Sequence, residues 1–376
     1  MYINKTKSTH SGQLERWLGT ERTEHLSRAM EGWYGPPIAV QGVPGAVYAT
    51  KDGDFVGRID AGIETSAIDR MDAIVARQRK QMYQRMGSRT GQRGAFTSLS
   101  DLIAEASAGK NYYNYFQKVG TTGVVASTNT LWFVGNMPAA GAAAAAAPGG
   151  TVPTDATTGS FVFTNPTSGD TRHFVYGEVT CGTAANTLLV YDRLFSVTKT
   201  MNSTATEAVT GVPTRYQNNT SGTADSAEGN FLIIECRTVL PATAHNWTTC
   251  TYTDQAGNAG ATLPSVTGNS ANIVNRLDQP AGTWFCPLAS GDTGIDSLTQ
   301  MQCSAAVATG AIDFTIGHPI AMMPCPAANM VCVTDGINTA FNLTRIFDDA
   351  CLAFLEITKP ATSATTYIGQ VRSVAG

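Results

Sequence analysis

Five residues near the C-terminal end of this 376-residue chain could in principle bind a metal ion. His318, Cys325 and Cys332 offer the imidazole and thiolate ligands that zinc prefers, and Asp313 and Asp335 lie nearby in the sequence. Their spacing matches no common zinc site, and prolines interrupt two of the intervals. The pattern therefore favours a core histidine and buried thiols over a metal site.

Two smaller groups could support acid–base chemistry. Asp348 and Asp349 form an acidic pair that could bind a divalent cation or exchange protons, but Arg345 is close enough in sequence to favour an ion pair at a turn. His173 follows Arg172 in a segment rich in turn residues, where solvent exposure is the favoured interpretation. Neither group points to a reaction.

Motifs of the common enzyme classes are absent from the sequence. There is no GxSxG, no HExxH and no GxGxxG at a strand-to-helix junction, and Ala108–Asn111 lacks the spacing and hydroxyl of a phosphate-binding loop. We therefore predict a non-enzymatic protein with no catalytic residues, no cofactor and no bound metal. A secreted hydrolase is the enzyme alternative.

The charge of the chain is unevenly distributed. Residues 1–118 hold 16 of the 25 lysine and arginine residues and 12 of the 29 acidic residues, which gives about +4 there and about −8 in the remainder. A pI near 5.7 argues against general nucleic-acid binding by the whole chain. The split predicts an N-terminal region that meets a different environment from the main body.

Residues 1–60 are punctuated by Gly/Pro and Asp/Gly pairs and show no sustained periodicity. They predict an extended arm with one short helix over Leu14–Met30. Trp17, Trp33 and Tyr34 are large apolar groups in this arm, and we expect them to contact a partner or the body of the protein.

Residues 61–118 are predicted to be mainly helical. Ser66–Met86 carries an apolar stripe at spacings of three and four, and a second helix is expected from Ser98 or Ser100 to Ala108, with Ser98 as N-cap and Gly109 as stop. The other face of the first helix is basic and includes Arg70, Arg77, Arg79, Lys80 and Arg85. That face suits solvent, an acidic neighbouring subunit or packaged nucleic acid.

Beyond residue 118 the sequence is typical of a β protein. Short runs rich in Val, Ile, Phe, Tyr and Thr alternate with turn residues: Ser160–Phe163, Thr187–Tyr191, Asn230–Glu235, Trp247–Tyr252 and Ile312–Ile316. We predict a mainly β fold with one or two antiparallel β-sandwich or jelly-roll units, over residues 119–235 and 236–376. A weak echo at an offset of about 150 residues supports a duplication.

All eight cysteines follow residue 180, at irregular spacing and without a CxxC pair. Met1–His10 is polar and lacks the apolar core of a signal peptide, so synthesis in a cytoplasm is expected. In that reducing compartment the cysteines are expected to be buried thiols rather than disulfides. The alanine-rich stretch Ala139–Pro148 is too short to span a bilayer, and no membrane association is expected.

Four strings in the sequence resemble a group of tailed-bacteriophage virion structural proteins: Phe96–Ile103 (FTSLSDLI), Tyr252–Gly260 (YTDQAGNAG), Pro287–Ile295 (PLASGDTGI) and Asp348–Leu355 (DDACLAFL). The resemblance covers about residues 96–360, and the first 95 residues have no counterpart. It implies a particle protein that resides in the virion and is made in the host cytoplasm. It carries over no functional residue.

Within that resemblance, a capsid cement or decoration protein is the favoured role. A β body and an N-terminal arm can bridge shell subunits through many weak contacts that add together. The expected partners are the major capsid protein or other virion subunits, and a homo-oligomer, guessed to be a trimer, is expected. The alternatives are the major capsid protein itself, whose fold is expected to carry a long spine helix, and a tail, baseplate or fibre adhesin with exposed aromatics such as Trp247.

Overall fold

The computed structural model describes residues 46–49, 55–59, 96, 98–122, 125–167, 169–182, 186–217, 227–337, 343–357 and 363–376. The chain divides into two compact units, residues 1–88 and 89–376. In the first unit, β1 (Ala46–Ala49) pairs antiparallel with β2 (Phe55–Ile59). The helices expected over Leu14–Met30 and Ser66–Met86 lie outside the described residues.

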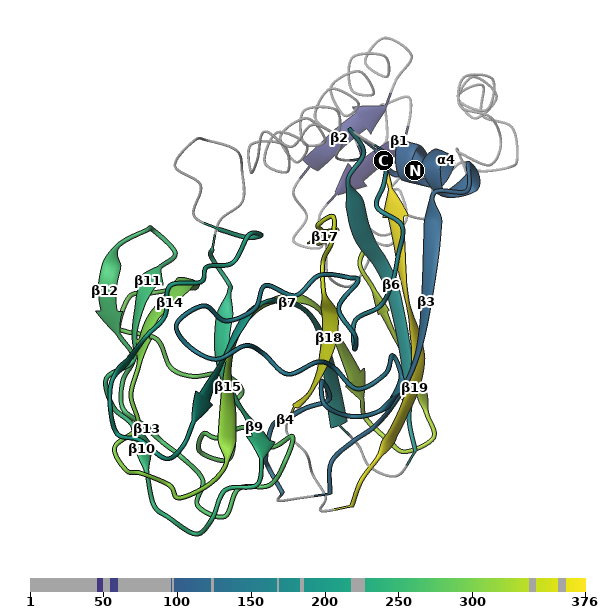
Figure 1. The fold of residues 1–376 in the computed structure, drawn as a ribbon. Coiled ribbons are helices and arrows are strands. Elements are labelled where there is room, and N and C mark those ends of the chain that lie inside the picture. The colour runs from purple at the N-terminus through teal and green to yellow at the C-terminus, as the bar shows by residue number, and fades with distance from the viewer. Residues whose placement is uncertain are drawn as a thin grey trace. The chain divides into compact units, whose positions relative to one another are not determined.

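The second unit is built from antiparallel sheets (Figure 1). A six-stranded sheet has the order β16-β6-β19-β3-β5, with β17 also pairing on β6. Its strands are β3 (Asn111–Val119), β5 (Asn136–Met137), β6 (Arg172–Cys181), β16 (Val331–Asp335), β17 (Arg345–Ile346) and β19 (Thr366–Ala375). The expected mainly β fold with antiparallel sandwich packing is confirmed.

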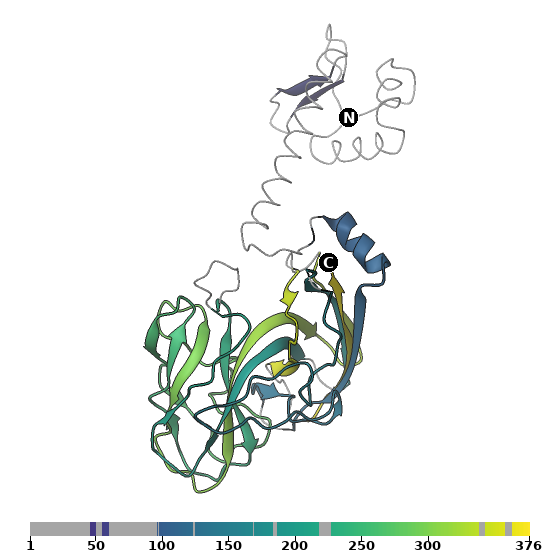
Figure 2. The ribbon, with the colours of Figure 1, turned by 45° about the horizontal axis from the view of Figure 1, so that its top comes forward.

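A five-stranded sheet lies between the six-stranded sheet and a four-stranded sheet (Figure 2). It consists of β4 (Asn129–Thr130), β18 (Leu352–Ile357), β7 (Asn186–Thr200), β15 (Ala311–Cys325) and β9 (Phe231–Thr238), in that order. The four-stranded sheet consists of β12 (Ala259–Thr262), β11 (Thr251–Asp254), β14 (Ile295–Met301) and β8 (Glu207–Ala208), and β10 (Asn246–Trp247) pairs with β13 (Val266–Thr267) beside it.

Aromatic contacts join the three layers. Trp247 lies edge-on against Phe314 of β15, with ring centroids 4.8 Å apart. On the other side of the five-stranded sheet, Phe354 of β18 meets Phe116 of β3 at 4.5 Å. All four rings are buried, and the burial of such large side chains dominates the stability of a core. Trp247 is only 1% exposed, so the expectation that it is a surface aromatic is wrong.

The second predicted helix forms as expected. In the part of the second unit that the structure describes, α4 (Leu99–Ser107) is the one helix, and the Oγ of its N-cap Ser98 accepts a hydrogen bond from the Asp101 backbone N–H at 3.0 Å. Gly109 follows with a φ of +89°, a conformation that glycine adopts without strain. The next residues form the strand β3, although the sequence assigned them to the helical segment. The aromatic residues of β3 therefore lie on both faces of a sheet.

Most of the predicted strands are confirmed. Thr187–Tyr191, Asn230–Glu235 and Ile312–Ile316 fall largely within β7, β9 and β15. Ser160–Phe163 is not a strand: it is irregular, and Phe161 is buried with its ring edge-on against Phe354 at 5.5 Å. Ser160–Phe163 therefore contributes to the core without pairing in a sheet.

Strands from the two expected β units pair with one another. β6 and β7 precede residue 235, whereas their partners β19 and β15 follow it, and residues 89–376 form one compact unit. Trp132 and Trp284, which correspond to each other in the weak sequence echo, also differ in environment, since Trp132 is 2% exposed and Trp284 is 43% exposed. The proposed boundary near residue 235 thus runs through shared sheets.

One face of the five-stranded sheet buries charge. Arg193 on β7 and Glu235 on β9 form an ion pair with Nη2–Oε2 at 2.6 Å, and Thr315 of β15 donates to the same carboxylate at 2.6 Å. The Arg193 guanidinium lies 4.8 Å from the Trp132 ring centroid. Neither charged group is exposed to water, so the attraction between the two must offset the free-energy cost of burying each charge.

We therefore expect Glu235→Gln to destabilise the protein by about 3 kcal/mol, because it leaves the buried Arg193 cation without its partner carboxylate. Urea unfolding followed by tryptophan fluorescence measures the change. The double variant R193M/E235L, which removes both charges, should lose much less. A single variant as stable as the wild type would contradict a buried ion pair.

Candidate interaction surface

The six-stranded sheet has one face on the core and one face toward solvent. Phe116, Val179, Tyr367 and Val371 are buried on the inner face. Side chains alternate between the two faces of a strand, so the residues between these point the other way. This alternation exposes a second set of side chains on three neighbouring strands and on the edge strand β16.

The register places these exposed side chains in adjacent rows. Tyr115 lies opposite Gln370, which lies opposite Glu178, and Arg372 is similarly flanked by Tyr113 and Tyr176. Tyr113 is 50% exposed, Tyr115 59%, Ile368 55% and Val331 62%. We call the following residues the outer sheet face: Tyr113, Tyr115, Val331, Val333, Ile368 and Arg372.

Hydrogen bonds fix the polar groups in the middle of this surface. Glu178 accepts from the Tyr176 hydroxyl at 2.7 Å and from Gln370 Nε2 at 2.6 Å. The Tyr176 and Gln370 bonds lower the pKa of Glu178, so this carboxylate is ionised at neutral pH. Arg372 Nε donates to Gln370 Oε1 at 2.9 Å. The guanidinium carbon of Arg372 lies 4.9 Å from the Tyr113 ring centroid and 5.0 Å from that of Tyr176.

This arrangement suits protein–protein contact. Tyrosine and arginine are enriched at interfaces and lysine is depleted, and the described outer sheet face contains two tyrosines, one arginine and no lysine. Side chains that are already ordered lose less entropy on binding. α4 packs against β3 and β19, and its Leu99 and Ile103 are also more than half exposed.

The sequence did not predict this surface. The residues it singled out for partner contact lie outside the described part of the chain and stay predictions: Trp17, Trp33, Tyr34, Arg70, Arg77, Arg79, Lys80 and Arg85. The available signal was the alternation within Asn111–Val119, where aromatic residues fall at both even and odd positions. A strand with aromatic residues on both faces, in a sheet that has solvent on one side, exposes some of those residues at the surface.

The residues of the possible zinc group do not meet. His318 and Cys325 lie at opposite ends of the second half of β15, roughly 20 Å apart for an extended strand. The His318 ring stacks on Tyr216 at 3.7 Å, and its Nδ1 donates to Asn230 Oδ1 at 2.8 Å. Burial lowers the pKa of His318 to about 4, which leaves it neutral. Among the described residues, no three ligating groups gather at one point.

The acidic pair at Asp348 and Asp349 is exposed at a turn. Asp349 has a φ of +58°, accepts from Asn165 Nδ2 at 2.7 Å and donates its backbone N–H to Asn165 Oδ1 at 3.1 Å. The guanidinium carbon of Arg345 lies 4.0 Å from the Phe347 ring centroid. Asp349 thus ties two loops together, which is a structural role.

His173 is buried, so its expected exposure is wrong, and the adjacent Arg172 is buried as well. Both lie on β6, whose backbone pairs with β19, rather than in the preceding turn. The Arg172 guanidinium is held between the rings of Tyr112, at 3.9 Å, and Phe163, at 4.2 Å. His173 Nδ1 donates to the Leu343 carbonyl at 2.7 Å, and burial lowers the pKa of this histidine.

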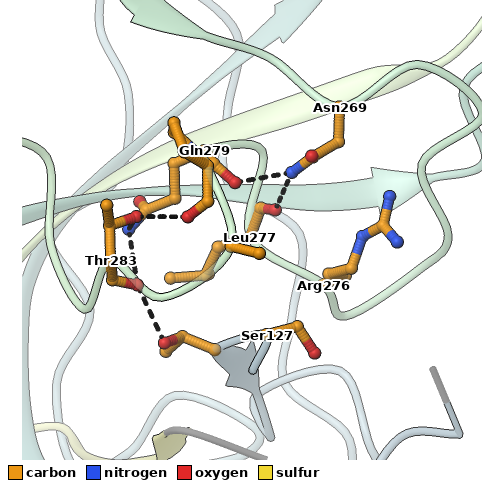
Figure 3. Close-up of a pocket in the computed structure, with 9 residues that line it drawn as sticks. Ser127, Asn269, Arg276, Leu277, Gln279 and Thr283 are labelled. Carbon is orange, nitrogen blue, oxygen red and sulfur yellow. Dashed lines mark hydrogen bonds between the residues drawn. The ribbon is translucent and has the colours of Figure 1, made fainter. Parts of the chain in front are cut away.

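A pocket between residues 127–128 and 269–283 has a volume of about 40 Å³ (Figure 3). Asn269 Nδ2 donates to the carbonyls of Leu277 at 3.0 Å and Gln279 at 2.6 Å. Gln279 Nε2 donates in turn to Thr283 Oγ1 at 3.0 Å. The space is far below that of a metabolite site, and these lining groups bind one another.

No helix in the described part of the chain is long and apolar enough to cross a membrane.

The similarity of this chain to known proteins is weak. No family model and no curated protein matches the chain. One similar solved chain belongs to the structure of infectious bursal disease virus, Gt strain, at 9% identity and a TM-score of 0.15, covering 71% of this chain and 81% of that one. Another belongs to the human polyomavirus 6 VP1 pentamer, at 11% identity and a TM-score of 0.12, covering 70% and 94%. The fold described above rests on strand pairing alone.

The cysteines are thiols, as the sequence predicted. None of the eight is in a disulfide, seven are buried, and Cys332 on β16 is half-buried. Burial raises the pKa of Cys236 and of Cys351 to about 12. A thiol that is both covered and protonated reacts slowly.

We expect a thiol-reactive dye to label native protein at Cys332 first, with the other seven reacting only after denaturation. The time course of dye release at neutral pH measures this, and Cys332→Ser should remove the fast phase. Cys325→Ser, at a buried position, is the matched control and should leave it intact. A fast phase that survives in Cys332→Ser would show that another cysteine is accessible.

Proposed function

We propose that this protein is a non-enzymatic structural protein of a tailed-phage virion, acting as a capsid cement or decoration protein. The outer sheet face is the observation that carries the proposal. It is an exposed apolar and aromatic surface on a sheet whose other face is anchored in the core. Surfaces of this kind mark contact sites on soluble proteins. The resemblance of four sequence strings to phage virion proteins supplies the context.

The body behind this surface is suited to bearing load. Three sheets pack in layers, and buried pairs such as Asp192–Arg215, with Oδ1–Nη2 at 2.8 Å, tie neighbouring segments together. A cement protein gains from such rigidity, because contacts to several subunits add only if the body holds them in fixed geometry. The histidines, cysteines and aspartates that could have supported chemistry pack in the core or connect loops, and they do not line a common cavity.

The partners we propose are the major capsid protein or other virion subunits, together with further copies of this chain in a homo-oligomer, for which a trimer fits capsid symmetry. The N-terminal region, with its arm and basic helix, would reach a neighbouring subunit. The major capsid protein is the alternative within the shell. A tail, baseplate or fibre adhesin would have to bind glycans through exposed rings such as Trp284, since Trp247 is buried.

Tyr115→Glu should weaken rebinding of the purified protein to stripped capsids at least tenfold, because it replaces an exposed aromatic ring of the outer sheet face with a second carboxylate, in the same cross-strand row as Gln370 and Glu178. Co-sedimentation with capsids measures the dissociation constant. Val162→Glu, at a 78% exposed position in an irregular segment, is the matched control and should bind as the wild type does. Equal binding by both variants would exclude the outer sheet face. A wild type that ignores capsids and binds host cells would favour the adhesin.

Deleting residues 1–60 should abolish assembly or docking and leave the sheets of residues 89–376 intact, since those residues form a compact unit of their own. Circular dichroism reports the fold, and incorporation into particles reports docking. Normal incorporation of the truncated protein would remove the arm from the proposal.

A further inference from the structure

The side chain of Asp278 is fully buried and accepts four hydrogen bonds. Its Oδ1 accepts from the Asn269 backbone N–H at 2.8 Å and from Asn272 Nδ2 at 3.0 Å. Its Oδ2 accepts from Trp247 Nε1 at 2.8 Å and lies 2.8 Å from His245 Nε2. One carboxylate therefore joins the start of β10 to the segment that follows β13.

The second ring nitrogen of His245 also faces an acceptor. Nδ1 lies 3.0 Å from the Thr243 carbonyl oxygen, which has no proton to give. A neutral imidazole has a single N–H, so it can donate to the Asp278 carboxylate or to this carbonyl and not to both. The geometry is satisfied only by a ring that is protonated on both nitrogens. His245 and Asp278 are then a buried ion pair at 2.8 Å.

His173 differs in this respect. Its Nδ1 donates to the Leu343 carbonyl, but its Nε2 lies 2.8 Å from the Thr171 hydroxyl, which can donate. A neutral ring satisfies that site. Two buried histidines of the same unit thus have opposite requirements, and only His245 needs the extra proton.

The surroundings of His245 supply few other charges. Burial lowers its pKa, but the Asp278 bond and the Thr243 carbonyl outweigh burial and raise the pKa above 6.5. The other ionisable groups near Asp278 are Arg276 and the thiols of Cys236, Cys286 and Cys303. Burial raises the pKa of each thiol and lowers the pKa of Arg276. At neutral pH those thiols are uncharged, which leaves His245 and Arg276 as the cations near Asp278.

The fit around the pair is tight. A Cβ at Gly268 would collide with the imidazole and lie 2.9 Å from Asp278 Oδ2. The segment behind the pair is held to the five-stranded sheet, since the Asp278 backbone N–H donates to the Ile234 carbonyl at 2.6 Å. The Gly268 backbone therefore packs closely against both the ring and the carboxylate.

We propose that His245 and Asp278 form a pH-sensitive latch: the protonated ring ties the Thr243 carbonyl to the buried Asp278 carboxylate, and it lets go of that carbonyl as the pH rises. A neutral ring keeps its N–H toward Asp278, because Asp278 is fully buried and charged, whereas Thr243 is only half-buried and its carbonyl is neutral. The bond to Thr243 is lost, and residues 241–244 are freed from the ring. The latch opens on the side of mildly alkaline pH.

The direction of the pH effect follows from the raised pKa. The stabilisation is complete below the unfolded value of about 6.5 and is lost as the pH rises through the folded value. Between those values the folding equilibrium constant falls by up to about tenfold per pH unit. Lys118, whose pKa burial lowers to about 8, acts in the opposite sense above that pH, so a variant comparison is needed.

The test uses the full-length chain. Nitrogen-15 NMR of the histidine rings should show His245 protonated on both nitrogens at pH 7 and titrating at higher pH than His173 and His318. The apparent stability of the wild type relative to His245→Gln should fall between pH 6.5 and the NMR-determined pKa, while that relative to His318→Gln stays flat. Asp278→Asn should lower the pKa of His245. A His245 ring with one proton at pH 7, or a slope unchanged in His245→Gln, would overturn the latch.

Discussion

The ladder between β7 and β15 is the interaction on which the rest of the second unit depends. Each strand is fifteen residues long, and the two are paired along nearly their whole length. β18 and β9 flank these two strands, β4 lies beyond β18, and nearly all side chains of β7 and of the first half of β15 are buried. Because these stretches are buried on both faces, their polar groups depend on partners within the protein.

This constraint explains why so much charge is paired inside a sparsely charged protein. Arg193 binds Glu235, Arg215 binds Asp192, and Thr198 donates to Asp313 at 2.5 Å. The same requirement holds at the buried Asp278, whose carboxylate joins the start of β10 to the segment that follows β13. The six-stranded sheet escapes the constraint on one side only, and that side presents its tyrosines and valines to solvent.

The sequence predicted the parts of this fold that depend on local chemistry. The Ser98 cap and the Gly109 stop bound α4 because both act within a single turn. The strands β7, β9 and β15 were predictable from their content of β-branched and apolar residues. The pairing of β7 with β15 could not be read, because it joins residues more than a hundred positions apart and leaves no local signature. For the same reason, the boundary that the sequence predicts near residue 235 falls between strands that share a sheet.

The candidate surface and the histidine sites were less predictable. The sequence predicted that His173 is exposed because turn residues precede it, but its strand pairs with β19, far along the chain, and this pairing buries it. Tyr113 and Tyr115 read as part of a helical region, since nothing local showed that β19 would pair with them. Whether a tyrosine faces the core or solvent depends on register, which only the partner strand sets.

The pairing of β3 with β19 also has a mechanical consequence. Asn111, the first residue of β3, lies opposite Val374, near the end of β19, so the chain enters and leaves this pair of strands at the same end of the sheet. Tension applied between the segment before α4 and residue 376 would therefore open the ladder one pair at a time, as a zip opens. A pull on opposite ends of the two strands would instead load all of their hydrogen bonds at once. The direction in which neighbours pull on this protein would decide how much force its sheet withstands.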